Sequence, residues 1–97
     1  MENPERDDYR ALIGEVFSIA FTDASIQLEL ASVDDIPYSG GAERPAPFSL
    51  TFLGPVEPVV LQATYEMTRG DERYVIFIVP IGPDPQTKRM QYEAIFN

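Results

Sequence analysis

The run Arg73–Pro80 constrains the fold of this chain more than any other stretch, because it holds six consecutive apolar residues from Tyr74 to Val79. Most of them are β-branched or aromatic, which strands favour, and Gly70 and Pro80 leave too little room for a helix. The pattern predicts a strand that is buried on both faces in the middle of a sheet. Pro80 is expected to end it, because proline cannot donate to a sheet ladder.

Five further segments alternate apolar and polar residues as short strands do. They cover roughly residues 16–21, 26–30, 48–52, 61–68 and 90–96. Proline-rich turns separate several of them, and no helical crossover segment that a parallel sheet would need is present. The predicted fold class is therefore mainly β: a small six-stranded antiparallel barrel, or a barrel-like sandwich, with one short N-terminal helix. A closed barrel is preferred because closure removes exposed sheet edges.

The helix is predicted within residues 1–14, from about Pro4 to Ile13. Asn3 followed by Pro4 is a helix-start signal, and Gly14 suits the left-handed residue that ends a helix. Because so short a helix is marginal alone, its apolar stripe must dock, and we expect it to cover one end of the barrel. The stripe comprises Tyr9, Leu12 and Ile13.

Residues 1–97 are expected to form a single domain, since a chain of this length buries enough surface for one core. The segment 34–47 is rich in proline, glycine and aspartate and has few core candidates. It is predicted to be a long exposed loop that is mobile in the isolated chain and carries contacts when a partner is present, because long loops more often carry function.

The charge of the chain excludes several partners. Sixteen acidic residues against seven basic ones give a formal net charge of −9, which disfavours nucleic acid and anionic membrane surfaces. No apolar stretch approaches the roughly 20 residues of a membrane helix, and the polar, acidic N-terminus does not resemble a signal peptide. A cytoplasmic location is the default expectation, although export as part of an assembled particle would leave no mark in the sequence.

The residue types needed for most catalysis are missing, because the chain contains neither histidine nor cysteine. This excludes serine–histidine and cysteine–histidine catalysis and most zinc sites, so acid–base chemistry would rest on carboxylates. The candidate acids, which we expect to face solvent, are Glu29, Asp34, Asp35, Glu66 and Glu93. Asp34 and Asp35 lack the ligand spacing of a calcium loop. No catalytic, cofactor or metal residue is predicted, and we expect that the protein is not an enzyme.

Arg69-Gly70-Asp71 matches a cell-adhesion tripeptide. The glycine lies where a hairpin needs one, so a turn is the preferred interpretation.

Four segments in order resemble a known family: Pro47–Pro55, Gln62–Met67, Phe77–Gly82 and Tyr92–Asn97. From about Leu12 onward the chain is similar to small bacterial proteins that carry a domain of unknown function, DUF6916. It departs from that pattern at Ala63, where glycine is frequent, and at Met67-Thr68-Arg69, where histidine is common. The resemblance implies no established activity. The occurrence of relatives near tail-fibre-like genes implies an assembly role, in a tail-fibre-like or other multi-protein particle.

Two functions remain open. Alternation along the apolar run places Tyr74, Ile76 and Ile78 on one face and the other three residues on the opposite face. A barrel has one dry side, so the second set needs cover from a protein partner or a second copy, with Phe77 as the anchor. These predicted interaction residues are Val75, Phe77 and Val79.

The alternative is a barrel that binds a small apolar or aromatic ligand, which requires an interior cavity of at least roughly 300 Å³. The aromatic residues that could line it are Phe17, Phe21, Phe48, Phe52, Tyr65 and Phe96. The competing interpretation is that a small barrel needs these side chains to fill its core.

Overall fold

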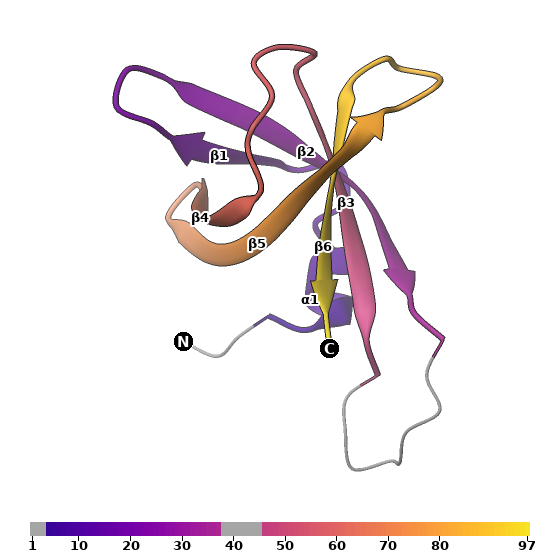
Figure 1. The fold of residues 1–97 in the computed structure, drawn as a ribbon. Coiled ribbons are helices and arrows are strands. Elements are labelled where there is room, and N and C mark those ends of the chain that lie inside the picture. Colours follow the sequence, from indigo (N-terminus) through magenta and orange to yellow (C-terminus); the bar gives the residue numbers. More distant parts are fainter. Residues whose placement is uncertain (1–3, 38–45) are drawn as a thin grey trace.

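In the computed structural model, which describes residues 4–37 and 46–97, six strands and one helix are present (Figure 1). The elements are α1 (Arg6–Arg10), β1 (Val16–Ala20), β2 (Ser25–Asp35), β3 (Phe48–Gly54), β4 (Ala63–Arg69), β5 (Glu72–Pro83) and β6 (Met90–Phe96). Each strand is antiparallel to its neighbours, and the strands close into a barrel in the order β1-β2-β3-β6-β5-β4. The predicted fold class, a mainly β six-stranded barrel with a short helix, is confirmed.

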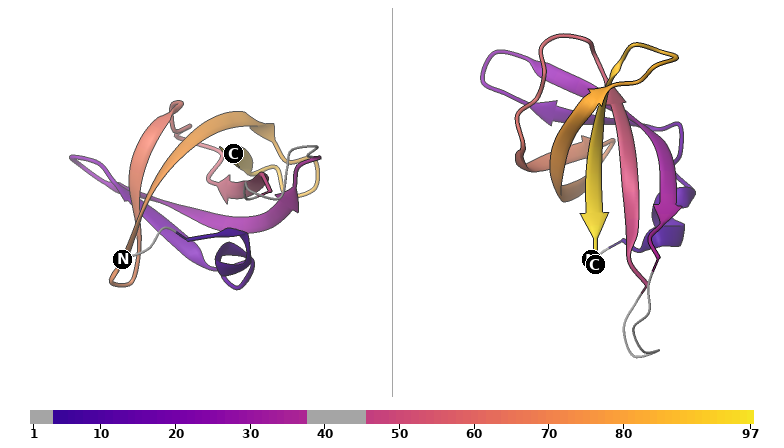
Figure 2. Two further views of the ribbon diagram at one scale, coloured as in Figure 1. Left: turned by 90° about the horizontal axis from the view of Figure 1, so that it is seen from below. Right: turned by 45° about the vertical axis from the view of Figure 1, so that its right-hand side comes forward.

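The connection from β3 to β4 crosses one end of the barrel, because β3 pairs with β6 whereas β4 pairs with β1 (Figures 1 and 2). Val60 in this connection is buried, and its N–H donates to the hydroxyl of Tyr92 at 2.7 Å. Gly54 ends β3 just before this connection, and a Cβ there would come within 2.6 Å of the Leu28 side chain. We call the end of the barrel that the β3–β4 connection crosses the crossover end. The opposite end, where α1 lies, is the helix end.

The barrel interior is filled by alternate residues of the strands, as the sequence periodicity predicts. The largest fully buried side chains are Tyr92, Phe17, Phe52, Ile19, Leu28, Leu30, Leu50, Met67, Ile76 and Ile78. Phe17 and Phe52 meet edge to face, with their ring centroids 5.5 Å apart. The interior is thus a packed core that draws on every strand.

The prediction that Pro80 ends the apolar strand is wrong, because β5 continues to Pro83. The ladder with β4 stops at Ala63↔Ile78, and beyond it β5 pairs only with β6. The two-residue turn between Arg69 and Glu72 fixes the alternation of β5, and this alternation directs the backbone nitrogen of residue 80 toward the β4 side. No described strand lies there at that point, so the missing N–H of Pro80 costs no ladder bond.

The apolar strand is also not buried on both faces. Tyr74, Ile76 and Ile78 point into the core, but Val75 is 70% exposed and Phe77 is 49% exposed. A closed barrel has a single dry interior, so the outer face of β5 meets solvent in the isolated chain.

The helix is shorter than predicted. Glu5 is its N-cap and forms a capping box with Asp8, whereas Asn3 lies outside the described residues. After Arg10 the chain continues in turns to Gly14, whose φ of 95° confirms the predicted left-handed residue. The N–H of Gly14 then donates to the carbonyl of Leu30 in β2 at 2.8 Å. Pairing with the sheet therefore replaces helical hydrogen bonds before a third turn can form.

Tyr9 closes the helix end of the barrel. Its ring lies 6.1 Å from the rings of Phe48 and Tyr74 and 5.5 Å from that of Phe96, all between centroids. Burial, with smaller contributions from Tyr74 and Asp8, raises the pKa of the Tyr9 hydroxyl to about 12. The predicted capping role of the helix is confirmed for this residue. Of the rest of the stripe, Leu12 is half-buried and Ile13 is exposed, which corrects the prediction for Ile13.

Two arginines fasten α1 to β2. Arg6 donates to Asp35 Oδ1 at 2.9 Å, and Arg10 donates to Asp35 Oδ2 at 3.3 Å. The hydrogen bond from Arg6, followed by the charges of both arginines, lowers the pKa of the Asp35 carboxyl despite some desolvation. One carboxylate at the end of β2 thus holds both ends of the helix.

The predicted loop 34–47 begins later than expected, because β2 includes Asp34 and Asp35, which pair with Ser49 and Phe48. The N–H of Ile36, which follows β2, donates to the carbonyl of Pro47, which precedes β3, at 3.1 Å. The contact between the two chain segments thus continues beyond the ladder. Pairing to β3 thus overrides the turn chemistry of the two aspartates. Residues 38–45 lie outside the described residues, so the prediction about that part of the loop stays a prediction.

Candidate interaction site

The five candidate acids do not converge on one site. Glu29 pairs with Arg89 at 2.8 Å, Asp35 pairs with Arg6 and Arg10, and Glu66 lies 3.8 Å from Arg73. The remaining two, Asp34 and Glu93, lie on β2 and β6. Within residues 4–37 and 46–97, no three acidic side chains gather where they could hold a metal ion. The three paired carboxylates thus form separate contacts with different arginines.

The aromatic residues proposed to line a ligand cavity separate into two groups. Five of them belong to the packed core or its border: Phe17, Phe48, Phe52, Tyr65 and Phe96. The sixth, Phe21, is exposed beyond the β1–β4 ladder, and its ring centroid lies 5.9 Å from that of Tyr65. Tyr65 also donates its hydroxyl to the carbonyl of Leu61 at 2.7 Å. Phe21 and Leu61, which fall within the predicted strand segments 16–21 and 61–68, are exposed beyond the strand ends.

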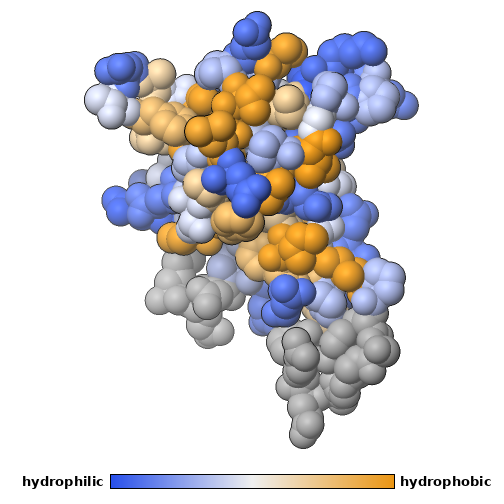
Figure 3. Space-filling model, in the orientation of Figure 1, coloured by the Kyte–Doolittle hydropathy of each residue, from blue (hydrophilic) through white to orange (hydrophobic). Residues whose placement is uncertain are grey.

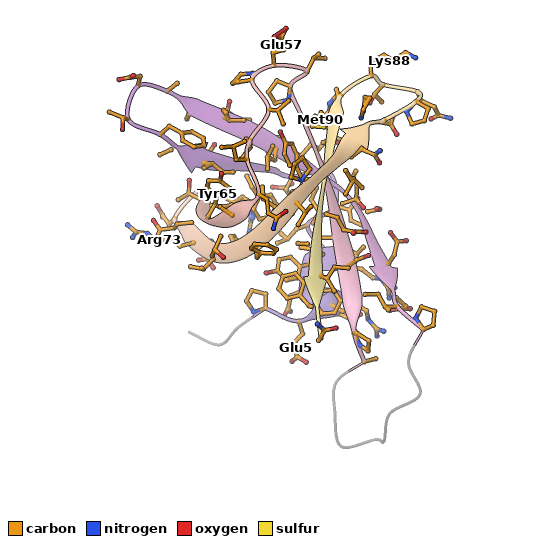
Figure 4. The ribbon with its side chains drawn as sticks, in the orientation of Figure 1. Glu5, Glu57, Tyr65, Arg73, Lys88 and Met90 are labelled. Atoms are coloured by element: carbon orange, nitrogen blue, oxygen red, sulfur yellow. The ribbon has the colours of Figure 1, made fainter. Side chains whose placement is uncertain are left out.

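The hollows found at the two ends of the barrel are grooves on its surface. The two at the helix end flank the first turn of α1, so that both are lined by Pro4, Asp7 and Asp8. One continues to Phe48 and Phe96, and the other to Glu72, Arg69 and Tyr74. In Figure 4, Glu5 marks this end and Glu57 marks the crossover end.

Val75, Phe77 and Val79, the predicted interaction residues, lie in a row along the outer face of β5. Val75 and Phe77 are exposed, and Val79 is half-buried. Across the ladders, Val75 faces Glu66, Phe77 faces Thr64 and Val79 faces Glu93. The structure therefore places the three residues on one surface, with carboxylates opposite two of them.

Ile95 belongs to the same surface and was missed by the sequence argument. It is 52% exposed on β6, two residues after Glu93, and so shares the outer face with it. The alternation of β6 could have found it, because Tyr92 and Ala94 are the inward residues of that strand. We call Val75, Phe77, Val79 and Ile95 the β5–β6 outer surface.

Polar residues interrupt and border this surface. Figure 3 shows apolar and polar residues interleaved over the face that β5 and β6 present in that view. Arg73, which begins the outer row of β5, points away from the barrel in Figure 4. Its nearest carboxylate is that of Glu66 at 3.8 Å. The exposed apolar side chains are thus set among charged groups.

The comparisons with known proteins place this geometry in a family. The profile of the domain of unknown function DUF6916 matches residues 4–96. The chain belongs to the DUF6916 family. No curated protein and no solved structure matches the chain. Membership of DUF6916 assigns no activity to this chain.

In this DUF6916 chain, Gly70 and Asp71 form the turn that follows Arg69, the last residue of β4, and Gly70 has a φ of 61°. Arg69 is held by Tyr74 and Glu15, at 3.4 Å and 3.6 Å from its guanidinium nitrogens. The interpretation as a hairpin turn is confirmed. Within the described residues, no helix is long and apolar enough to cross a membrane.

Proposed function

We propose that the chain is a non-enzymatic protein-interaction module that docks a partner protein on its β5–β6 outer surface. The observation that carries this proposal is the exposure of Val75 and Phe77 at the centre of a strand whose other face fills the core. Aromatic and β-branched side chains on an outer barrel face add little to the stability of the monomer. Aromatic side chains such as that of Phe77 are enriched at protein interfaces and concentrate their energy.

The charge of the chain favours a partner of opposite sign over a second copy. The formal net charge is −9, so two copies repel each other at low ionic strength. Glu93 and Glu66 border the apolar row, and a partner with lysine or arginine around an apolar centre complements them. An assembly role in a larger particle is compatible with such a surface, and the packed core gives the ligand-binding alternative less support.

A site-specific cross-linker tests the proposal. We expect a photo-reactive residue at position 77 to capture a partner, and the same residue at position 61 to capture none. Leu61 is the matched control because it is 75% exposed and lies on the β3–β4 connection. Phe77→Ser is expected to abolish capture while Leu61→Ser leaves it unchanged. Both variants should unfold as wild type does, because exposed substitutions shift the free energy of unfolding by about 0.5 kcal/mol or less.

Equal capture at the two positions would contradict the proposal, and so would capture that Phe77→Ser leaves intact. Sedimentation velocity at rising protein concentration distinguishes a second copy from another protein. A dimer that forms in the wild type and is lost in Phe77→Ser would replace the basic partner by self-association.

A further inference from the structure

Among residues 4–37 and 46–97, no strand lies along one side of the helix-end half of β5. Its ladder with β6 holds four residue pairs, from Val79↔Glu93 to Pro83↔Met90. Glu72–Ile78 pair with β4 alone, among the residues that the structure describes. In Figure 1 the two strands meet at the crossover end and diverge toward the helix end. Among the described residues this strand edge is therefore open, as are stretches of β2 and β4 where the neighbouring ladders are short.

The hairpin geometry identifies the backbone groups along this edge. A two-residue turn, such as the one between Arg69 and Glu72, is closed by a hydrogen-bonded pair. From that pair onward, the backbone groups of alternate residues point to opposite sides of the strand. Tyr74 and Ile76 thus direct theirs to β4, whereas Val75 and Phe77 direct theirs to the side that β6 has left.

The exposed apolar side chains lie along the same edge. If the β5–β6 register continued past Val79↔Glu93, Phe77 would face Ile95. The two side chains are 49% and 52% exposed and flank the point where the ladder stops. Free backbone groups beside exposed apolar side chains are the two features with which strand-addition sites bind an extended peptide.

The core behind this edge is already sealed. Tyr9 lies between Tyr74 of β5 and Phe96 of β6, at 6.1 Å and 5.5 Å between ring centroids. A strand added along β5 therefore does not have to displace the core. Asp7 and Asp8 line both grooves beside Tyr9, so the inner side of an added strand meets negative charge.

We infer that the open edge of β5 accepts an extended segment of the partner protein in which apolar and basic residues alternate. Its backbone pairs with Val75 and Phe77, its apolar side chains lie outside against Phe77 and Ile95, and its lysines or arginines face Asp7 and Asp8. The inference rests on the proposed function and specifies how the partner binds. The net charge of −9 favours such a segment over a second copy of this chain.

Amide exchange and proline substitution test whether the edge is free. We expect the amides of Val75 and Phe77 to exchange fast, and those of Tyr74 and Ile76 to be protected by β4. Val75→Pro removes a donor that no described strand uses, so its Tm should stay within about 5 °C of wild type. Ile76→Pro is the matched control and should fail to fold. Protected amides at both Val75 and Phe77 in the free chain would overturn the inference.

A synthetic peptide tests the binding mode. The probe is a capped peptide of about seven residues with alternating valine and lysine, which suffices to span a typical strand. Its saturating addition should slow exchange at Val75 and Phe77 at least tenfold. A second peptide, N-methylated on alternate residues, keeps the charge and side chains and should bind at least tenfold more weakly. No slowing of exchange, or equal binding of the two peptides, would refute strand addition.

The proline variant separates this inference from the proposed function. Partner capture that is lost in both Phe77→Ser and Val75→Pro supports strand addition. Capture that is lost in Phe77→Ser and kept in a folded Val75→Pro leaves the docking surface in place and refutes strand addition. A dimer that the wild type forms and Val75→Pro does not would overturn the choice of a basic partner.

Discussion

The two ends of the barrel are closed by different means. At the crossover end, β5 and β6 stay paired, and Val60 lies over Tyr92 with its N–H on the tyrosine hydroxyl at 2.7 Å. At the helix end the two strands have diverged, and the ring of Tyr9 fills the space between Tyr74 and Phe96. One end is closed by backbone pairing and a crossing chain, and the other by an inserted side chain.

This difference shows where the barrel can change without losing its fold. Backbone pairing at the crossover end involves several groups at once, so we expect it to open less readily than the helix end. The helix end depends on five helical residues and on ion pairs with Asp35. A helix of this length has little stability of its own. The free edge of β5 lies at this second, more adaptable end.

The variant with the largest expected effect, Tyr9→Ala, opens the helix end of the barrel. Tyr9→Ala removes a ring that contacts three other aromatic rings, and it should lower the free energy of unfolding by roughly 3–5 kcal/mol. Urea denaturation followed by circular dichroism measures this loss. Leu12→Ala, at a half-buried site on the same stripe, should cost less. A loss below about 1 kcal/mol for Tyr9→Ala would mean that the ring does not close this end.

Alkaline pH should weaken the same end through the Tyr9 hydroxyl. Its pKa rises from 10.0 to about 12 in the folded chain, so the unfolded chain releases the proton first. The contribution of the protonated Tyr9 hydroxyl to the free energy of unfolding is fully present below pH 10. It falls by roughly 2–3 kcal/mol as the pH approaches 12. Tyr9→Phe should lose less stability over that interval than the wild type. Parallel stability curves for the two proteins between pH 9 and 12 would contradict the assignment.

A pair of tyrosine substitutions tests the crossover end. Tyr92→Phe removes the acceptor of a buried N–H, that of Val60, and should cost roughly 1–3 kcal/mol. Tyr65→Phe removes a hydroxyl whose bond to the Leu61 carbonyl is exposed, and should cost under about 1 kcal/mol. Thermal unfolding of both variants measures the difference. Equal losses would show that the crossing chain adds no more than a surface contact.

The smallest expected effect concerns Asp35. Asp35→Asn weakens the exposed contacts to Arg6 and Arg10, so amide exchange in α1 should quicken while global stability changes little. The folded-state pKa of Asp35 is lowered, so its contribution is present above about pH 4 and is lost as the pH falls further. Exchange rates of α1 that match the wild type at neutral pH would show that Tyr9 alone positions the helix.

Much of the fold could be predicted from alternation alone. The inward and outward sets of β5 were assigned correctly, because side-chain direction in a strand depends only on residue parity. Gly14 and Gly70 were recognised for a similar reason, since both have a positive φ that glycine adopts without steric cost. The three interaction residues follow from the same parity, and Ile95 would have followed from it on β6.

Where each strand and α1 end depends on which other strand lies beside it. Pro80 does not end β5, because β4 has already ended where its N–H would be needed. Asp34 and Asp35 extend β2 because β3 lies beside them, and α1 ends early because Gly14 pairs with Leu30. Turn and cap preferences are local energies of about 1 kcal/mol, which several ladder bonds outweigh.

The sequence by itself thus determined the barrel class, the inward and outward sets of the central strand and the apolar row on β5, because parity and turn chemistry are encoded locally. Only the tertiary structure decided that β6 leaves β5 at Val79, that Tyr9 fills the space, and that the row lies beside free backbone groups. Strand divergence depends on the twist and closure of the whole sheet, and no single segment of the sequence records that geometry.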